Sequence, residues 1–387
     1  MICPKDKCTG CHACYNICPK KAIDMVEDEC GYIYPIINPN CIDCGLCKKV
    51  CPNFKEKSFE NPKRCYAMHA LDKDIHKSST SGGAATLFSK YIIENGGVVY
   101  GAAYSNDMSL HHIRVNKVEN LKKLQGSKYV HSYIDDKYKM ALEDLKNNLL
   151  VLFIGTPCQI DGLKSFLKKD YANLLTIDLI CHGVPGQKLL RDEIGLHTDI
   201  DKVSHISFRD KDGRNFKVFD INNKEIFNAA NNDNYYYFAF LHGLIFRENC
   251  FSCPYAKMER VSDITIGDFW GLGKQKQFNH SKSDGISVLL VNNDKGQKMV
   301  NDCNELMFFE EREVLEAVEG NSNLQKVSPR HKKRDKFLKE YPIYGYKVAI
   351  KSSLGFTLLK EKEKEKVKLI IKKNKLLLYI IKKIKHK

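Results

Sequence analysis

The feature that most constrains this chain is a cysteine pattern that occurs twice near its start. The stretch CTGCHACYNICP begins at Cys8, and the stretch CIDCGLCKKVCP begins at Cys41. Four cysteines and the proline after the fourth recur in register, each 33 positions later. The eight cysteines are Cys8, Cys11, Cys14, Cys18, Cys41, Cys44, Cys47 and Cys51. Spacing this regular, with no sign of secretion, indicates ligands of metal centres.

The spacing is that of bacterial ferredoxins with two [4Fe–4S] clusters, in which the fourth cysteine of each run binds the other run's cluster. One cluster is then bound by Cys8, Cys11, Cys14 and Cys51, and the second by Cys18, Cys41, Cys44 and Cys47. Between the runs, AIDMV and GYIYPII predict short strands, and each run is expected to turn into a helix that begins near its proline. We therefore expect residues 1–55 to form a dicluster ferredoxin domain that moves electrons.

Zinc and disulfides are the competing interpretations of these cysteines. A zinc knuckle needs two cysteines, whereas each run has four and a following proline. Disulfides are disfavoured because a chain of 387 residues can bury a core without them and no apolar leader is expected at its start. So many free thiols predict a reducing cytoplasm and, since exposed clusters are easily oxidised, an anaerobic setting.

The net charge of +15 is concentrated at one end of the chain. From Lys360 to Lys387 there are twelve lysines and three glutamates, a net +9, and the rest is nearly balanced. Nucleic-acid binding is therefore not expected. No uncharged apolar run is long enough to predict a membrane-spanning helix.

Residues 346–387 are predicted to form a basic amphipathic helical tail, because apolar residues recur at helical intervals between lysines. Two interpretations stay open: a solvated helix packed on the body, or a helix that binds an anionic membrane or an acidic partner. The KEKEKEK segment that precedes the apolar positions is expected to be an exposed spacer. The apolar positions are Val367, Ile370, Ile371, Leu377, Leu378, Ile381 and Ile384.

The predicted fold class is α/β (mixed α+β), with a large mixed domain over residues 65–345 after a polar connector. Residues 203–228 alternate like an antiparallel meander, and Ser81 is placed to cap the first helix of the domain. Strands are predicted within 96–104, 148–155, 173–180, 262–270 and 285–291, and helices within 86–95, 135–147 and 159–169.

Four further cysteines lie in unusual surroundings: Cys158 in GTPCQI, Cys181 in ICHGVP, and Cys250 and Cys253 in ENCFSCPY. Cys158 and Cys181 each follow an apolar strand, where α/β proteins place their chemistry. The four could bind a third [4Fe–4S] cluster. Alternatively, Cys158 and Cys181 are buried apolar residues or a nucleophile, and Cys250 and Cys253 bind zinc or nothing. The remaining thiols lack cluster spacing and are interpreted as plain cysteines: Cys3, Cys30, Cys65 and Cys303.

Several motifs of the body follow one another in an order that resembles the coenzyme F420 hydrogenase/dehydrogenase beta-subunit family, over about residues 65–320. They are SSTSGGAATLFSKYIIENGGVVYGAAY, LQGSKYVHS, VLFIGTPCQIDGLK, IDLICHGVP, FRDKDG and CPYAKMERVSDITIGDFWG. The resemblance implies an iron–sulfur flavoprotein in which FAD lies next to a [4Fe–4S] cluster bound by Cys158, Cys181, Cys250 and Cys253. It also implies a redox partner protein or ferredoxin and a small two-electron substrate.

Candidate flavin and substrate residues follow from that resemblance. Ser79, Thr80, Ser81, Gly82 and Gly83 offer hydroxyls and free N–H groups to a phosphate or a flavin carbonyl at a helix start, although a plain N-cap would look the same. Gly126, Ser127, Lys128 and Tyr129 suit a pyrophosphate and a ring, or a surface turn.

Three side chains complete the set. Trp270 is expected to wall the flavin ring or to anchor the core. His182 is the candidate for proton supply and Arg209 for anion holding, and either could instead have a structural hydrogen-bonding role.

The predicted function is that of an FAD- and iron–sulfur-dependent oxidoreductase of the cytoplasm. Its substrate is coenzyme F420-type or unknown, since the body also resembles stand-alone bacterial proteins associated with polysaccharide biosynthesis. The alternatives are a non-enzymatic ferredoxin-like electron-transfer partner and an accessory protein that its tail recruits to the inner membrane face. No G-x-G-x-x-G follows a strand, so a Rossmann nicotinamide site is not indicated.

Overall fold

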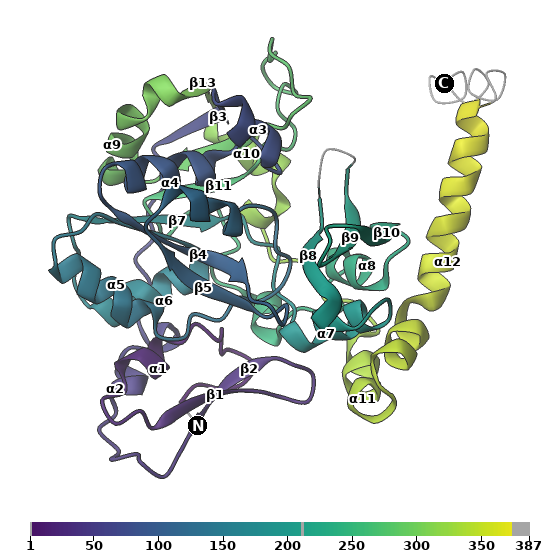
Figure 1. Ribbon diagram of the computed structural model, residues 1–387, viewed down its shortest axis with the longest axis horizontal. Coiled ribbons are helices and arrows are strands. Elements are labelled where there is room, and N and C mark those ends of the chain that lie inside the picture. The colour runs from purple at the N-terminus through teal and green to yellow at the C-terminus, as the bar shows by residue number, and fades with distance from the viewer. Residues whose placement is uncertain (1, 210–212, 374–387) are drawn as a thin grey trace.

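The computed structural model describes residues 2–209 and 213–373, with side chains as far as residue 364. A small cysteine-rich module at the start of the chain lies against one end of a larger domain built on an eight-stranded sheet (Figure 1). A three-stranded sheet and the last helices lie to one side of that domain (Figure 1). The predicted mixed α/β class with an N-terminal dicluster module and C-terminal helices is confirmed.

The module contains one hairpin and short helical segments. Strands β1 (Ile23–Glu27) and β2 (Ile33–Ile37) pair antiparallel, as AIDMV and GYIYPII predict. The expected helix positions were wrong: α1 (Ala13–Ile17) and α2 (Leu46–Lys49) lie within the cysteine runs and end before the prolines. The reason is local, because a residue before proline is forced into extended backbone, and Cys18 and Cys51 have ψ angles of 114° and 121°. In the described part of this module, the single turn η1 (Pro52–Phe54) is the helical segment that begins at a proline.

The large sheet has the strand order β13-β3-β12-β11-β7-β6-β4-β5. Strands β4, β6, β7 and β11 are mutually parallel, and β3 runs the same way because β12 is antiparallel to both β3 and β11. The carboxyl ends of these five strands therefore meet at one edge of the sheet, where α/β proteins place their ligands. The strands are β3 (Arg64–Ala70), β4 (Val98–Tyr104), β5 (Leu110–Val115), β6 (Val151–Gly155), β7 (Leu174–Leu179), β11 (Ile264–Asp268), β12 (Ser287–Val291) and β13 (Met307–Arg312).

Helices cover both faces of this sheet because its inner strands are apolar on both sides. Val99 and Leu152 pack toward α4 (Ala84–Glu94) and α9 (Asp294–Asp302), whereas their neighbours Val98 and Val151 pack toward α5 (Lys137–Lys146) and α6 (Pro157–Leu167). This alternation is the period of two that a pleated strand imposes. Helix α10 (Val314–Gly320) covers the second face near β3.

Helix α4 begins differently from the prediction. Ser81 does not cap it: the N-cap is Gly83, with φ of +84° and no side-chain cap. A residue in the left-handed region is least strained when it is glycine, so the backbone at the helix start is set by Gly83 rather than by a hydroxyl.

The predicted meander is confirmed as a separate antiparallel sheet of β8 (Val203–Ser207), β9 (Asn215–Asp220) and β10 (Glu225–Ala230), in the order β10-β9-β8. It shares a hydrophobic core with four helices. These are α7 (Gln187–Gly195), α8 (Tyr235–Leu241), α11 (Arg334–Tyr344) and α12 (Tyr346–Lys373). The remaining helical segments are α3 (Lys73–Ser78), η2 (Val118–Lys123), η3 (Ile200–Lys202), η4 (Glu248–Ser252), η5 (Asn304–Leu306) and η6 (Ser322–Leu324).

Helix α12 begins as part of this core. Ala349, Ile350, Leu354 and Leu358 are buried, and the helix continues through the segment expected to be a spacer. The predicted amphipathic positions from Val367 onward lie outside the residues whose side chains the structure describes. Over the described part of the chain, none of the helices combines the length and apolar character that crossing a bilayer requires.

Candidate cofactor sites

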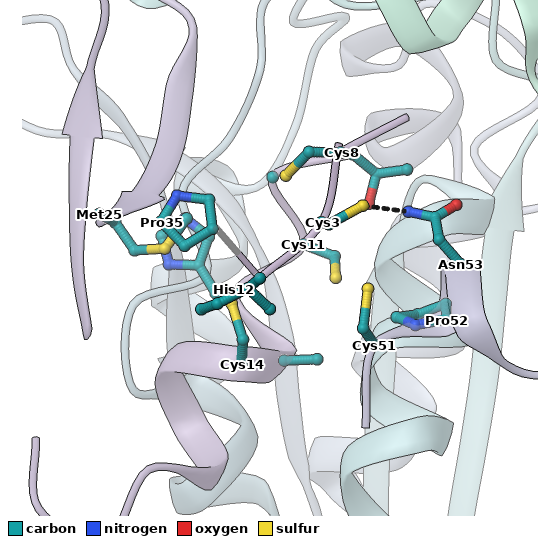
Figure 2. A pocket seen from close by; sticks show the side chains of 14 residues that line it. Cys3, Cys8, Cys11, His12, Cys14, Met25, Pro35, Cys51, Pro52 and Asn53 are labelled. Atoms are coloured by element: carbon teal, nitrogen blue, oxygen red, sulfur yellow. Dashed lines mark hydrogen bonds between the residues drawn. The ribbon is translucent and has the colours of Figure 1, made fainter. Parts of the chain in front are cut away.

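The structure brings together the four cysteines predicted to bind the first cluster. Cys8, Cys11, Cys14 and Cys51 all line one hollow of about 330 Å³. Figure 2 shows their side chains around it, with the sulfur atoms of Cys11 and Cys51 pointing toward one another. The fourth cysteine of the second run thus joins three of the first, as the ferredoxin rule requires.

The donor set fits a cubane better than a single ion. Within the described ranges, no three His, Cys, Asp or Glu side chains are grouped so that they could hold a metal ion. A [4Fe–4S] core has a different requirement, because each thiolate binds its own iron at a corner of the cube. Thiols spread around a central volume meet that requirement.

Cys3 is a residue of this hollow that the sequence did not identify. It is buried, it lines the hollow, and its Sγ accepts a hydrogen bond from Asn53 Nδ2 at 3.3 Å. The Cys3 thiol also lies beside two of the predicted ligands: its hydrogen bonds lower the pKa of Cys8 and Cys51 and raise its own. Cys3 stands outside both cysteine runs, so its spacing carried no signal.

The second predicted set lies nearer the surface. Cys18, Cys41 and Cys47 are half-buried and Cys44 is exposed. Cys18 Sγ accepts a hydrogen bond from the Ala22 amide at 3.2 Å. Burial raises the pKa of Cys47, and Cys41 and Cys18 are close enough to raise it further. Three of the four thiols are thus neighbours at the exposed end of the module.

The four cysteines of the body line a second hollow, of about 500 Å³. Cys158 follows β6 at the start of α6, where the Thr156–Gln159 capping box and Pro157 fix the first turn. Cys181 follows β7, and Cys250 and Cys253 lie in and just after η4. Three loops that are far apart in sequence therefore deliver thiols to one place.

Of the four body thiols Cys250 is buried and the other three are half-buried, and the four lie near one another. Burial raises the pKa of Cys158 to about 12 and of Cys250 and Cys253 to about 11, and it also raises that of Cys181. The thiols raise one another's pKa values as well, since each would carry a like charge. Thiolates in such surroundings need a cation beside them, which a bound metal centre would supply.

The two hollows are adjacent. Thr9 lines both of them. Helix α6, which carries Cys158, also touches the module at Gly162, where an added Cβ would lie 2.9 Å from Cys11 Cβ and 3.0 Å from Cys11 Sγ. The absence of a side chain at Gly162 therefore lets the module dock beside the loop of Cys158.

The two predicted flavin segments meet in the structure. Ser127 Oγ donates to Thr80 Oγ1 at 3.1 Å. The loop that contains Gly82 lies at the carboxyl end of β3, where the Ala70 amide donates to Gly82 O at 2.7 Å. Among the described residues, Ser81 Oγ is a buried oxygen with no hydrogen-bond partner, which leaves it available to a bound group.

The amine of Lys128 is oriented toward the backbone. Its Nζ donates to the carbonyls of Leu124, Gln125 and Gly126 at 2.7–3.2 Å, and burial lowers its pKa to about 7. The aromatic ring of Tyr129 instead packs on Phe240, with 4.6 Å between ring centroids.

His182, Arg209 and Trp270 lie at the same edge of the sheet as the second hollow. His182 lines the hollow beside Cys181, and its ring is 6.4 Å from that of Phe240, which Tyr129 also contacts. Burial lowers the pKa of His182, and the charge of Arg214 lowers it further. The sequence did not identify Arg214 or Phe240.

Arg209 is held by an ion pair with Asp268, the last residue of β11. Trp270 is 39% exposed and is stacked by two guanidinium groups, those of Arg209 at 5.6 Å and Arg214 at 4.6 Å from its ring. A half-exposed tryptophan with two guanidinium groups close to its ring suits a planar, negatively charged ligand.

Comparison with known proteins assigns two segments of the chain. Residues 149–316 match the family described as the C-terminal part of the coenzyme F420 hydrogenase/dehydrogenase beta subunit. Residues 7–54 match the 4Fe-4S dicluster domain. The first segment holds all four cysteines of the second hollow, and the second holds all eight of the paired runs.

Two curated relatives come from Methanocaldococcus jannaschii. A coenzyme F420-dependent sulfite reductase is 28% identical over 187 residues, which are 46% of this chain and 28% of that protein. An uncharacterised protein is 26% identical over 197 residues, which are 43% of this chain and 54% of that protein. The chain thus spans about half or less of the length of either relative.

Among solved structures, a chain of the F420-reducing [NiFe] hydrogenase complex from Methanosarcina barkeri is similar at 16% identity and a TM-score of 0.43. The similarity covers 69% of this chain and 93% of that chain.

Proposed function

We propose that this chain is an FAD-dependent oxidoreductase with three [4Fe–4S] clusters. The proposal starts from the two matches, of residues 149–316 to the coenzyme F420 hydrogenase/dehydrogenase beta-subunit family and of residues 7–54 to the 4Fe-4S dicluster domain. The observation that carries the proposal is the second hollow, in which Cys158, Cys181, Cys250 and Cys253 converge from three loops beside the ferredoxin module. When bound, the clusters supply single-electron transfer, and the flavin supplies the exchange between one-electron and two-electron chemistry.

The chain's own residues divide into three tasks. The twelve cysteines hold the clusters. The segments 79–83 and 125–129 hold the flavin, for which Ser81 Oγ and the contact between Thr80 and Ser127 are the supporting observations. His182, Arg209 and Trp270 face the substrate, with the arginine and the indole ring holding a planar anionic group. The flavin segments, the substrate-side residues and the four body cysteines lie near the edge where the parallel strands end.

The exposed end of the ferredoxin module is the proposed contact for a redox partner. Cys44 is exposed, whereas Cys8, Cys11 and Cys51 are buried, so a partner protein can approach the second cluster site most closely. A deazaflavin is the first two-electron substrate to test, since a relative's name specifies coenzyme F420. Peripheral membrane contact through residues 360–387 stays a prediction that flotation with anionic liposomes can test.

Cofactor analysis of anaerobically purified protein tests this function. We expect FAD in the supernatant after denaturation, and a loss of bound FAD with retained iron in Thr80→Val combined with Ser127→Ala. If iron-loaded protein contained no flavin, the proposed FAD-dependent oxidoreductase would be excluded. The alternative function, non-enzymatic electron transfer between proteins, would then remain.

Substrate-side residues are tested separately. Arg209→Gln should weaken reduction or oxidation of the bound flavin by an anionic deazaflavin without changing the flavin content, because the anion loses its counter-charge. Arg209→Lys, which keeps the charge, is the matched control. An unchanged reaction in Arg209→Gln would exclude Arg209 from substrate binding.

A further inference from the structure

A buried arginine is hydrogen-bonded to one lining residue of each hollow. Arg247, just before η4, is fully buried. Its Nη2 donates to Cys8 O at 2.9 Å, its Nη1 donates to Ile33 O at 2.9 Å, and its Nε donates to Asn249 Oδ1 at 3.3 Å. The guanidinium also lies 4.6 Å from the centre of the Tyr34 ring. One side chain thus joins the first cysteine loop to the loop that carries Cys250.

Every one of these partners is neutral. Among the described residues, Arg247 forms no ion pair. The two other fully buried arginines each pair with a carboxylate, Arg260 with Asp178 and Arg334 with Glu248. A buried charge without a counter-charge is costly, because hydrogen bonds to neutral acceptors do not replace the lost hydration of an ion. The protein therefore needs a negative charge close to Arg247.

The only large negative charges expected there are those of the clusters. A [4Fe–4S] core with four thiolates carries about two net negative charges, and reduction adds one more. Arg247 is bonded to a proposed ligand of each site, since its Nη2 donates to the carbonyl of Cys8 and its own carbonyl accepts a hydrogen bond from the Cys250 amide at 3.1 Å. The close packing at Gly10, where an added Cβ would lie 3.3 Å from Arg247 Cζ, keeps the guanidinium against the first cysteine loop.

We propose that Arg247 is the shared counter-charge of the two cluster sites, and that it raises the reduction potentials of both clusters together. The effect on the body cluster rests on the proposed function, because that cluster is itself a proposal. The effect on the first ferredoxin cluster does not, since Cys8 belongs to the dicluster domain. A unit charge acting over several ångströms in a partly dry interior is expected to change such an equilibrium about tenfold. Each cluster would then be easier to reduce. Reduction of one cluster adds a negative charge beside Arg247, which would lower the reduction potential of the other.

Redox titration of the iron-loaded chain, followed by paramagnetic resonance, tests this role. Arg247→Gln removes the charge and keeps part of the hydrogen bonding, whereas Arg247→Lys keeps the charge and loses the fork of donors. The paired variant Arg334→Gln with Glu248→Gln is the matched control, because it removes an equally buried guanidinium together with a carboxylate.

We expect the midpoint potential of Arg247→Gln to be lower than that of the wild type by at least about 59 mV. For a one-electron couple, this shift corresponds to a tenfold change in the ratio of reduced to oxidised cluster. Arg247→Lys and the paired control should stay close to the wild type. Equal shifts in the Gln and Lys variants, or none in either, would overturn the proposal.

Failure of assembly is informative as well. Iron uptake by Arg247→Lys but not by Arg247→Gln would support a need for the charge, and failure of both would show that Arg247 acts only as a hydrogen-bonding scaffold. Iron content of the wild type distinguishes the two proposals: with about eight irons per chain the third cluster is absent, yet the first cluster still reports the effect of Arg247.

Discussion

At the scale of single residues, the cluster sites depend on more than their ligands. Cys3 lies beside Cys8 and Cys51, and its thiol can donate to sulfur atoms that are bound to iron. Hydrogen bonds to cluster sulfurs are one of the means by which proteins set reduction potentials. Cys3 is therefore expected to adjust the first cluster without binding it.

The substitution Cys3→Ala tests this role. We expect unchanged iron content and a lower midpoint potential of one cluster, because a donor to negatively charged sulfur is lost. Cys65→Ala is the control, since Cys65 is equally buried but lies in β3. A loss of about four irons from Cys3→Ala would instead make Cys3 a ligand.

The ligands of the body site make a second prediction at this scale. Cys158→Ser should reduce the iron content by about four per chain and leave the signals of the two ferredoxin clusters in place. The reason is that Cys158 lines only the second hollow. Unchanged iron content and spectra would exclude Cys158 as a ligand.

At the scale of elements, α6 joins the two halves of the molecule. Its first turn carries Cys158, and Gly162 contacts Cys11 of the module. A methyl group at Gly162 would lie within 3.0 Å of Cys11 and of Tyr138 Oη. Neighbouring atoms would have to move, and overpacking of this kind costs about 1–3 kcal/mol.

Gly162→Ala is accordingly expected to lower the thermal midpoint and to weaken the first cluster. The control is Gly355→Ala in α12, where nothing lies within 4 Å of the added Cβ. That change should stabilise the helix by about 0.5–1 kcal/mol, because alanine loses less backbone entropy than glycine. Calorimetry under anaerobic conditions compares the two, and a Gly162→Ala protein as stable as the wild type would contradict the proposed docking contact.

The elements also show what sequence patterns could and could not predict. Apolar runs such as VVYGAAY predicted the inner strands β4, β6, β7, β11 and β12, because strands buried on both faces contain little else, but the inner strand β3 was not predicted. The edge strand β13 was not predicted, because only the first and last residues of its sequence MFFEER are buried. Ser81 was assigned the cap of α4 because a side-chain rule cannot anticipate that Gly83 takes a left-handed backbone.

Spacing identified the eight ferredoxin cysteines because their ligand rule is local. The grouping of Cys158 and Cys181 with the Cys250 loop depends on strand order instead, and no local pattern contains strand order. Arg247 and Cys3 carried no signal at all, because their partners are distant in sequence.

At the scale of the whole molecule, the first part of helix α12 packs into the hydrophobic core of the large domain. Ile350, Leu354 and Leu358 of α12 are buried in the core shared with α8 and α11. Each such side chain contributes about 1.5–3 kcal/mol when fully buried. Later residues of the helix, such as Lys360 and Lys364, are exposed.

Two truncations follow from this boundary. Removal of residues 346–387 should give an unstable or insoluble protein, because the core loses these side chains. Removal of residues 365–387 should leave the thermal midpoint and the iron content nearly unchanged, while abolishing any binding to anionic liposomes. A strong loss of stability on removal of residues 365–387 alone would contradict the assignment of the stabilising contacts to the earlier part of α12.

We propose above that the body holds a cluster of its own beside the two of the ferredoxin module. Iron quantification of fully reconstituted protein, with paramagnetic resonance after dithionite reduction, tests it most directly. We predict about twelve irons per chain and signals from three interacting [4Fe–4S] centres, of which one disappears in Cys158→Ser. About eight irons, with spectra that Cys158→Ser leaves unchanged, would contradict it.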